Sequence, residues 1–260
     1  MKVPIFQIDA FASTLFTGNP AAVCPLEQWL PDALLQKIAA ENNLAETAYF
    51  VHSESGYHLR WFTPAVEVDL CGHATLAAAW VILNELDPKA VSVSFQSRGG
   101  PLSVSRQGDI YTLDFPASMP ERLPPNPQLE DALGCPIVEL WGARDYVAVL
   151  ASEQAVRSVK PSMEKLKGLD RFAVIVTAPG KDYDCVSRFF APAAGVDEDP
   201  VTGSAHCTLA PFWAARLNRN PIRAFQASSR GGEVHCEVLG DRVLLSGTAV
   251  KFLEGTINLE

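Results

Sequence analysis

Several features that would assign this chain to a large class of proteins are missing from its sequence. No apolar run approaches the length of a membrane span, and the start of the chain turns polar by Gln7, so it lacks the apolar segment of a signal peptide. Lysine and arginine form no cluster longer than a pair, and the formal net charge is -9 at pH 7. We therefore expect a cytoplasmic protein that binds neither nucleic acid nor an anionic membrane.

Metal-ligand spacing is missing as well. The six cysteines occur without a C-x-x-C pair, and the five histidines show neither H-E-x-x-H nor two histidines with a carboxylate. We therefore expect mostly buried thiols, no zinc knuckle, no thioredoxin motif and no cofactor. A metal site assembled in space from distant residues is left open.

What the chain does contain is a repeat. Residues 62–69 (FTPAVEVD) resemble residues 190–197 (FAPAAGVD), and each copy continues through a short loop into an apolar stretch, one beginning at Gly72 and the other at Gly203. The tetrapeptide SRGG also occurs twice, at 97–100 and 229–232. The chain is therefore a diverged tandem duplication, and a site shared by the two halves should lie where they face each other.

The repeat and the proline content set the expected domain boundaries. The length suits two domains of about 120–130 residues, each able to build its own core. Five prolines within 116–127 predict a linker. We expect an N-terminal domain over 1–116 and a C-terminal domain over 117–249. Residues 250–260 lie beyond the clear repeat and could close either domain, the first being our choice.

In both halves the sequence pattern predicts strands, a surface helix, more strands, a buried helix and hairpins, in that order. Gly18-Asn19-Pro20 predicts a turn, and Pro31-Asp32 predicts the start of a helix to about residue 43. Apolar stretches over 72–86 and 203–217 predict helices wrapped by sheet, the second kinked at Pro211. The strands predicted for the first half cover 3–11, 21–24, 49–51 and 58–62.

Each buried helix begins directly after a loop of small and polar residues. Its first N–H groups have no partner within the helix and the helix dipole is positive there, so helix starts at Gly72 and Gly203 could together clamp a carboxylate. The alternative is that these glycines only permit a tight turn. We expect a small carboxylate metabolite as the partner.

The two loops differ at the positions where chemistry is expected. Cys71 precedes the first helix, whereas Thr202 stands at the matching place in the second. A two-base epimerase with a thiol on each face of the substrate would need cysteine at both. His73 and Asp199 could instead meet as a hydrogen-bonded pair in which the carboxylate fixes the imidazole tautomer. The simpler alternatives are a structural histidine and an N-terminal cap before Pro200.

Glu46 is the third candidate, at the point where a predicted helix gives way to a strand. A single glutamate in such a place is most often a solvated loop residue. Its candidacy therefore depends on the segments around it.

Taken together, these segments resemble the PhzF-like family, which is named for an isomerase of phenazine biosynthesis and is related in fold to diaminopimelate epimerase. Any one of these segments alone would be weak evidence for the resemblance, but the whole set is specific for the family. The matching segments span most of the chain and cover 9–11, 18–23, 43–48, 60–75, 199–205 and 229–232.

The resemblance implies an α/β (α+β) fold with two pseudo-symmetric domains, each a mixed β-sheet curled around a central buried α-helix, and an active site between them. It implies an isomerase without a cofactor and leaves open whether the protein is a homodimer. The implied catalytic residues are Glu46, His73 and Asp199. The implied substrate-binding residues are Gly72, Gly203 and Ser204. The substrate itself does not carry over, because relatives share a site while their substrates differ.

We therefore expect a proton shift in which Glu46 removes a proton from carbon and returns it elsewhere on the same face. His73 with Asp199 would protonate or polarise the substrate. Two alternatives stay open. One is an amino-acid epimerase or dehydratase that uses Cys71 opposite Thr202. The other is a metabolite-binding protein without catalysis.

Overall fold

The two halves of the chain fold with the same order of strands, as their repeated sequence predicts. The computed structural model describes residues 1–54 and 56–259 and divides into two units: Met1–Asp114 with Ser246–Glu260, and Phe115–Leu245. The proline-rich segment 116–127 lies in the second unit, and the end of the chain returns to the first. Among the described residues, no helix has both the length and the apolarity needed to cross a membrane.

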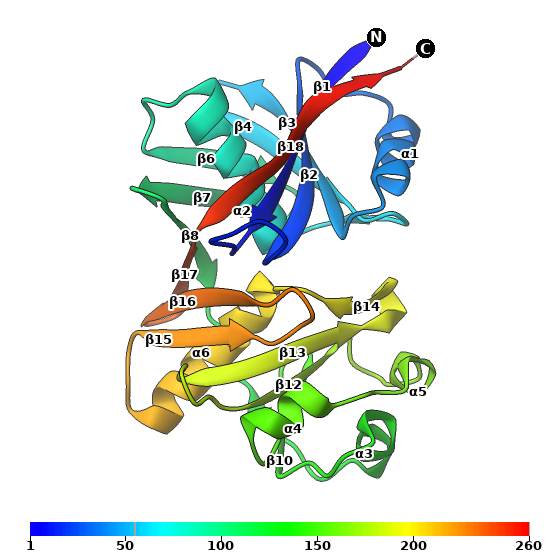
Figure 1. Ribbon diagram of the computed structural model, residues 1–260, viewed down its shortest axis with the longest axis vertical. Coiled ribbons are helices and arrows are strands. Elements are labelled where there is room, and N and C mark those ends of the chain that lie inside the picture. Colours follow the sequence, from blue (N-terminus) through cyan, green and yellow to red (C-terminus); the bar gives the residue numbers. More distant parts are fainter. Residues whose placement is uncertain (55, 260) are drawn as a thin grey trace. The chain divides into compact units, whose positions relative to one another are not determined.

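The first unit is mostly strand, and Figure 1 shows its elements in the blue, cyan and green part of the chain with the red end. In chain order it forms β1 (Lys2–Ala10), β2 (Asn19–Leu26), α1 (Asp32–Asn42), β3 (Glu46–Ser53), β4 (Gly56–Phe62), β5 (Glu67–Val68), α2 (Gly72–Val81), a π-helical turn (Ile82–Leu86), β6 (Ser92–Ser97), β7 (Gly100–Gln107), β8 (Ile110–Pro116) and β18 (Ala249–Asn258). Each strand predicted for this half forms, and β2 and β3 extend beyond the ranges predicted for them.

The second unit repeats this arrangement with additional short helices. In chain order it forms β9 (Glu121–Arg122), α3 (Pro127–Leu133), β10 (Glu139–Gly142), β11 (Tyr146–Val149), α4 (Glu153–Ser158), α5 (Met163–Lys167), β12 (Val174–Pro179), β13 (Cys185–Ala191), a 3-10 turn (Pro192–Ala194), β14 (Val196–Asp199), α6 (Gly203–Leu217), β15 (Ile222–Gln226), β16 (Gly232–Leu239) and β17 (Arg242–Gly247).

Strand pairing shows that the repeat is structural as well as sequential. In the first unit β1–β2 is antiparallel, β2–β3 parallel, β3–β4 antiparallel, β4–β6 parallel and β6–β7 antiparallel. The second unit has the same sequence of pairings along β10, β11, β12, β13, β15 and β16. The strand pairing within each unit is therefore mixed, as expected for the fold class. In the first, β18 adds to the free side of β1.

Helix α2 is the centre of the first unit, and its composition explains why. Every residue of α2 except Trp80 is buried, so the helix needs cover on all sides, and it packs against β1, β2 and β3. The predicted helix 72–86 continues past Val81 as a wider π-helical turn. There Asn84 Nδ2 donates to the Trp80 carbonyl at 2.7 Å, an acceptor that a regular α-helix gives to the backbone N–H of residue 84.

Helix α6 occupies the matching place in the second unit and contains Pro211 in its interior. A proline cannot donate to the carbonyl four residues before it, which here belongs to Cys207. The backbone N–H of Ser118 donates to that carbonyl at 3.0 Å. The proline-rich segment that contains Ser118 thus satisfies the acceptor that Pro211 leaves without its usual helical partner.

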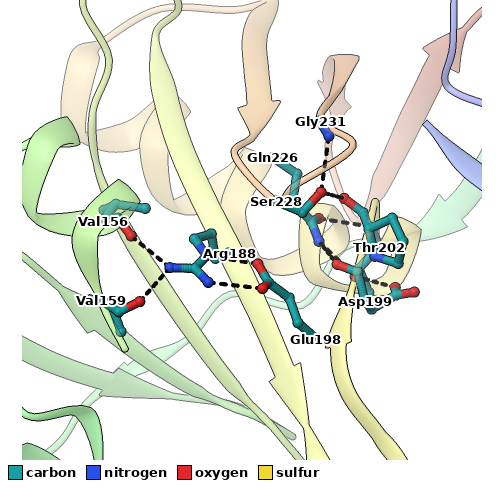
Figure 2. Close-up of polar contacts among 10 residues, drawn as sticks. Val156, Val159, Arg188, Glu198, Asp199, Thr202, Gln226, Ser228 and Gly231 are labelled. Atoms are coloured by element: carbon teal, nitrogen blue, oxygen red, sulfur yellow. Dashed lines mark hydrogen bonds and ion pairs between the residues drawn. The ribbon is translucent and has the colours of Figure 1, made fainter. Parts of the chain in front are cut away.

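One ion pair is repeated in both units with the same geometry. In the first, Arg60 on β4 donates to both carboxylate oxygens of Glu67 at 2.7 and 2.9 Å. In the second, Arg188 on β13 donates to both oxygens of Glu198 at 2.7 and 2.8 Å, as Figure 2 shows. Arg188 also donates to the carbonyl of Val159 at 2.7 Å, at the end of α4. These pairs fix the short strands that lead into α2 and α6.

Replacing Arg188 by methionine should lower the free energy of unfolding by about 2 kcal/mol, because Glu198 then loses both donors in a largely buried place. Urea denaturation measures this change. The control is Lys165→Met, which removes a pair with Asp131 between side chains that are 52% and 67% exposed. Lys165→Met should lower the free energy of unfolding by less than about 0.5 kcal/mol. Equal losses in the two variants would contradict the structural role of Arg188.

Candidate functional site

Glu46 and His73, both predicted as catalytic from the sequence, come together in the first unit. Glu46 begins β3, three residues after the left-handed turn at Asn43 that ends α1. His73 is the second residue of α2. Its Nε2 lies 3.2 Å from Oε2 of Glu46. These two atoms are close without completing a hydrogen bond, as is common for catalytic pairs before a substrate binds.

Two polar groups face the other ring nitrogen of His73. The amide Nδ2 of Asn19 lies 3.1 Å from Nδ1, and the thiol Sγ of Cys71 lies 3.5 Å from it. Asn19 is fully buried and begins β2, the strand parallel to β3 that pairs Ala21 with Glu46. The first residues of two neighbouring parallel strands thus meet the first turn of α2.

Sequence analysis did not select Asn19, because Gly18-Asn19-Pro20 has the composition of a turn. A signal was nevertheless present, since a buried asparagine must satisfy its amide through hydrogen bonds. No pattern in the sequence indicates that one partner of this amide is His73, which follows it by more than two strands.

Burial determines the charge of His73. The residue is only 3% exposed, and desolvation lowers the pKa of its imidazole to about 3. The ring is therefore neutral at physiological pH. The contact between Glu46 and His73 is therefore not an ion pair with an imidazolium.

Glu46, Cys71 and His73 also offer one ligand atom each within 4.8 Å of one another. Sequence spacing gave no sign of this cluster. However, Cys71 lies nearest to Nδ1 of the ring and Glu46 nearest to Nε2. A single ion binds one imidazole nitrogen, so the arrangement fits a chain of hydrogen bonds through the ring better than three ligands around one ion.

Asp199, the third predicted catalytic residue, belongs to a buried network in the second unit (Figure 2). It ends β14 and its Oδ2 accepts a short hydrogen bond from the Thr202 hydroxyl. Gln226, fully buried at the end of β15, organises this loop. Its Oε1 accepts from the Thr202 backbone N–H at 2.8 Å, and its Nε2 donates to the Asp199 carbonyl at 2.6 Å and to the Thr202 hydroxyl at 3.1 Å.

Ser228, directly before the second SRGG segment, supports the same loop with the help of Gly231 in that segment. Ser228 donates its hydroxyl to the Pro200 carbonyl at 2.8 Å and accepts from the Gly231 backbone N–H at 3.0 Å (Figure 2). Gly231 has φ +65, and a Cβ there would lie 2.8 Å from the Phe225 ring. The repeated motif therefore serves the loop geometry here, and glycine is required by conformation and by space.

The predicted carboxylate-binding residues Gly72, Gly203 and Ser204 occupy the first turns of α2 and α6. Among the described residues, neither helix has a side-chain hydrogen bond capping that turn. Arg144 donates to the Ser204 hydroxyl at 3.2 Å, and its guanidinium also donates to both carboxylate oxygens of Asp145 at 3.1 Å, which offsets its charge. Sequence analysis missed Arg144. The partial positive charge at an anion site here would therefore come from the first-turn N–H groups of the helices.

His206 is a second buried histidine that sequence analysis did not select. It is fully buried in α6, and its Nδ1 lies 2.7 Å from the Thr202 carbonyl. A carbonyl only accepts, so Nδ1 carries the proton and donates it. Burial lowers the pKa of this imidazole to about 4.

His73 belongs to the first unit and Asp199 to the second. The hydrogen-bonded pair predicted for them stays a prediction. Within its own unit each has other partners: Glu46, Asn19 and Cys71 for His73, and Thr202 for Asp199.

Comparison with known proteins agrees with this architecture. A model of the phenazine biosynthesis-like protein family, PhzC-PhzF, matches residues 8–255. An uncharacterized isomerase of Pseudomonas aeruginosa is 50% identical over 259 residues, covering 100% of both chains. The crystal structure of a PhzF-family phenazine biosynthesis protein from Enterococcus faecalis has a TM-score of 0.97 at 48% identity, covering 100% of both chains.

A more distant structure defines the fold class. A hydroxyproline epimerase from Agrobacterium vitis is 10% identical, with a TM-score of 0.63 over 98% of this chain and 92% of that chain, so it shares the fold alone. The duplicated epimerase-like fold predicted from the sequence is thus confirmed. Within that class, the chain belongs to the phenazine biosynthesis-like PhzC-PhzF family.

The buried state of His206 predicts how stability depends on pH. The pKa is about 4 in the folded protein against 6.5 for the ordinary imidazole, so the unfolded chain takes up a proton first as the pH falls. Stability should therefore be lost progressively between pH 6.5 and pH 4, by on the order of 2–3 kcal/mol from this group.

Urea denaturation at several pH values measures this loss. His206→Gln removes the titrating group, so its stability should fall less steeply over that window than that of the wild type. Part of the slope should remain, because buried His73 acts in the same direction. Parallel curves for the variant and the wild type would contradict the assignment.

Proposed function

We propose that the chain is an isomerase of the PhzF type that shifts a proton along a small carboxylate-bearing metabolite without a cofactor. The observation that carries the proposal is the contact of Glu46 with the neutral, buried imidazole of His73. Relatives of this family are named isomerases, which supports the same reaction class.

Glu46 is the group that we propose removes the proton from carbon. Its side chain is 15% exposed, so a substrate can reach it while most of its surroundings are protein. After removal, the same carboxyl group returns the proton to another carbon of the substrate, which leaves the composition of the substrate unchanged. Such a general base contributes roughly 10²–10⁴ to a rate.

The negative charge that develops on the substrate needs positive groups nearby. We propose that the substrate carboxylate is bound by Gly72 in the first turn of α2 and by Gly203 and Ser204 in the first turn of α6. Asp199 is the third proposed catalytic residue. Its carboxylate accepts from Thr202, and Gln226 holds the loop that carries both.

The alternative epimerase or dehydratase mechanism would use Cys71 and Thr202 as its two bases. The contact of Cys71 with His73 at 3.5 Å suits a reactive thiol. Thr202, however, already donates its hydroxyl proton to Asp199, and Gln226 donates to the same hydroxyl oxygen. A hydroxyl engaged in this way is a poor base, and we therefore prefer the mechanism with one base.

The remaining expectations concern the setting of the protein. A cytoplasmic location, a homodimer and the absence of nucleic-acid binding stay predictions from composition and resemblance.

Glu46→Gln should abolish turnover, because the amide keeps the shape of the carboxyl group and cannot take a proton. The measurement is mass-detected deuterium incorporation from deuterated buffer into a panel of conjugated amino and hydroxy carboxylic acids. With any substrate found, we expect a loss of roughly 10²–10⁴-fold. Glu41→Gln is the matched control, since Glu41 is exposed at the end of α1. It should exchange at the wild-type rate.

The same panel separates the alternatives. Exchange confined to the α-carbon of a free amino acid, and abolished by Cys71→Ser, would support the epimerase. Thermal stabilisation by a panel compound without exchange, unaffected by Glu46→Gln, would support a binding protein. Near-wild-type exchange in Glu46→Gln would refute the proposed base.

A further inference from the structure

We propose that Asn19 is a positioning residue that fixes which nitrogen of His73 carries the proton and thereby makes His73 a hydrogen-bond donor toward Glu46. The significance of this role for catalysis rests on the proposed function of Glu46. The position of the proton on the His73 ring does not depend on that proposed function.

The first step concerns the ring. A neutral imidazole carries one proton, on either Nδ1 or Nε2, and the bare nitrogen can only accept. His73 is neutral and has a different neighbour at each nitrogen: Asn19 at Nδ1 and Glu46 at Nε2. The two contacts therefore cannot be satisfied independently, because the choice of proton at one nitrogen decides the role of the other.

The second step concerns the neighbours. Glu46 as a carboxylate only accepts, so an Nε2 without a proton would direct its lone pair at a negative oxygen 3.2 Å away. With the proton on Nε2, the contact is attractive. Nδ1 is then the acceptor, which matches the Nδ2 amide of Asn19 at 3.1 Å and the thiol of Cys71 at 3.5 Å. Glu46 and Asn19 favour the same tautomer, and Cys71, whose thiol can donate or accept, is compatible with it.

The third step concerns the choice of residue at position 19. Aspartate has the size of asparagine but only accepts, so it would require the proton on Nδ1 and reverse the tautomer. Asparagine is also uncharged, which suits a side chain with no exposed surface. The amide thus supplies a donor at a buried position where a charged side chain would be costly.

The consequence for the reaction is that His73 acts through Glu46. An N–H 3.2 Å from one carboxylate oxygen of Glu46 favours the charged form of that side chain, which is the form able to remove a proton. In enzymes where a histidine is held in the wrong tautomer, the rate falls by orders of magnitude although the geometry is intact.

The test is a long-range proton–nitrogen NMR spectrum of the ¹⁵N-histidine-labelled protein near neutral pH, in which protonated and bare ring nitrogens resonate apart. His73→Gln and His206→Gln assign the two buried rings. For His73 we expect a protonated Nε2 and a bare Nδ1. His206 is the internal control, because its Nδ1 donates to the Thr202 carbonyl and it must show the opposite tautomer.

Asn19→Asp should move the proton of His73 to Nδ1 or leave both nitrogens protonated, and should lower the deuterium exchange rate at least about 100-fold. Asn218→Asp, at an exposed position after α6, is the matched control and should change neither quantity. If Asn19→Asp fails to fold, Asn19→Ala tests the same role, because it should remove the preference for one tautomer.

The outcomes separate this inference from the proposed function. A protonated Nδ1 in wild-type His73 would overturn the inference whatever the activity of the protein. An unchanged tautomer in both Asn19 variants would also overturn it. The expected tautomer combined with undiminished exchange in Glu46→Gln would leave the role of Asn19 standing and reject Glu46 as the base.

Discussion

Each unit must cover a helix that is apolar on all sides, and the positions of the candidate side chains follow from that requirement. Helix α2 can be buried only if the sheet curls around it, which brings β1, β2 and β3 against it. Strands β2 and β3 are parallel, so their first residues lie at the same edge of the sheet. Asn19 and Glu46 begin these strands, and His73 lies in the first turn of the helix. Packing thus assembles the cluster.

The same enclosure controls the electrostatics. Full burial removes the hydration that would stabilise an imidazolium, and the carboxylate of Glu46 nearby does not compensate, since desolvation dominates the pKa of His73. In a neutral ring, a hydrogen bond from Asn19 to Nδ1 leaves the proton on Nε2, beside Glu46. An imidazolium carries a proton on both nitrogens whatever its neighbours are. Desolvation is therefore what allows an uncharged amide to influence the candidate base.

The sequence predicted the fold well because the fold depends on repeated local patterns. The helices at 72–86 and 203–217 were recognisable from all-round apolarity, and the duplication was visible in the segments before them. Residues such as Asn19, Arg144 and Gln226 were not found, because their partners are distant along the chain and their own neighbourhoods have the composition of a turn, a loop or a strand. The position of Glu46 beside His73 also required the strand order, since no local pattern relates the start of a strand to a helix two strands later.

The two units keep the same framework and differ where the candidate chemistry lies. Arg60–Glu67 and Arg188–Glu198 preserve one ion pair in both, and it fixes the approach to each central helix. After that point the first unit places a neutral histidine beside a carboxylate, while the second ties its carboxylate, Asp199, into hydrogen bonds with Thr202 and Gln226. A rigid shared framework tolerates such divergence at the ends of its strands and at the starts of its helices. Thr202 stands where a symmetric two-base enzyme would carry a second thiol, and its hydroxyl donates to Asp199. That asymmetry favours Glu46 as the single base.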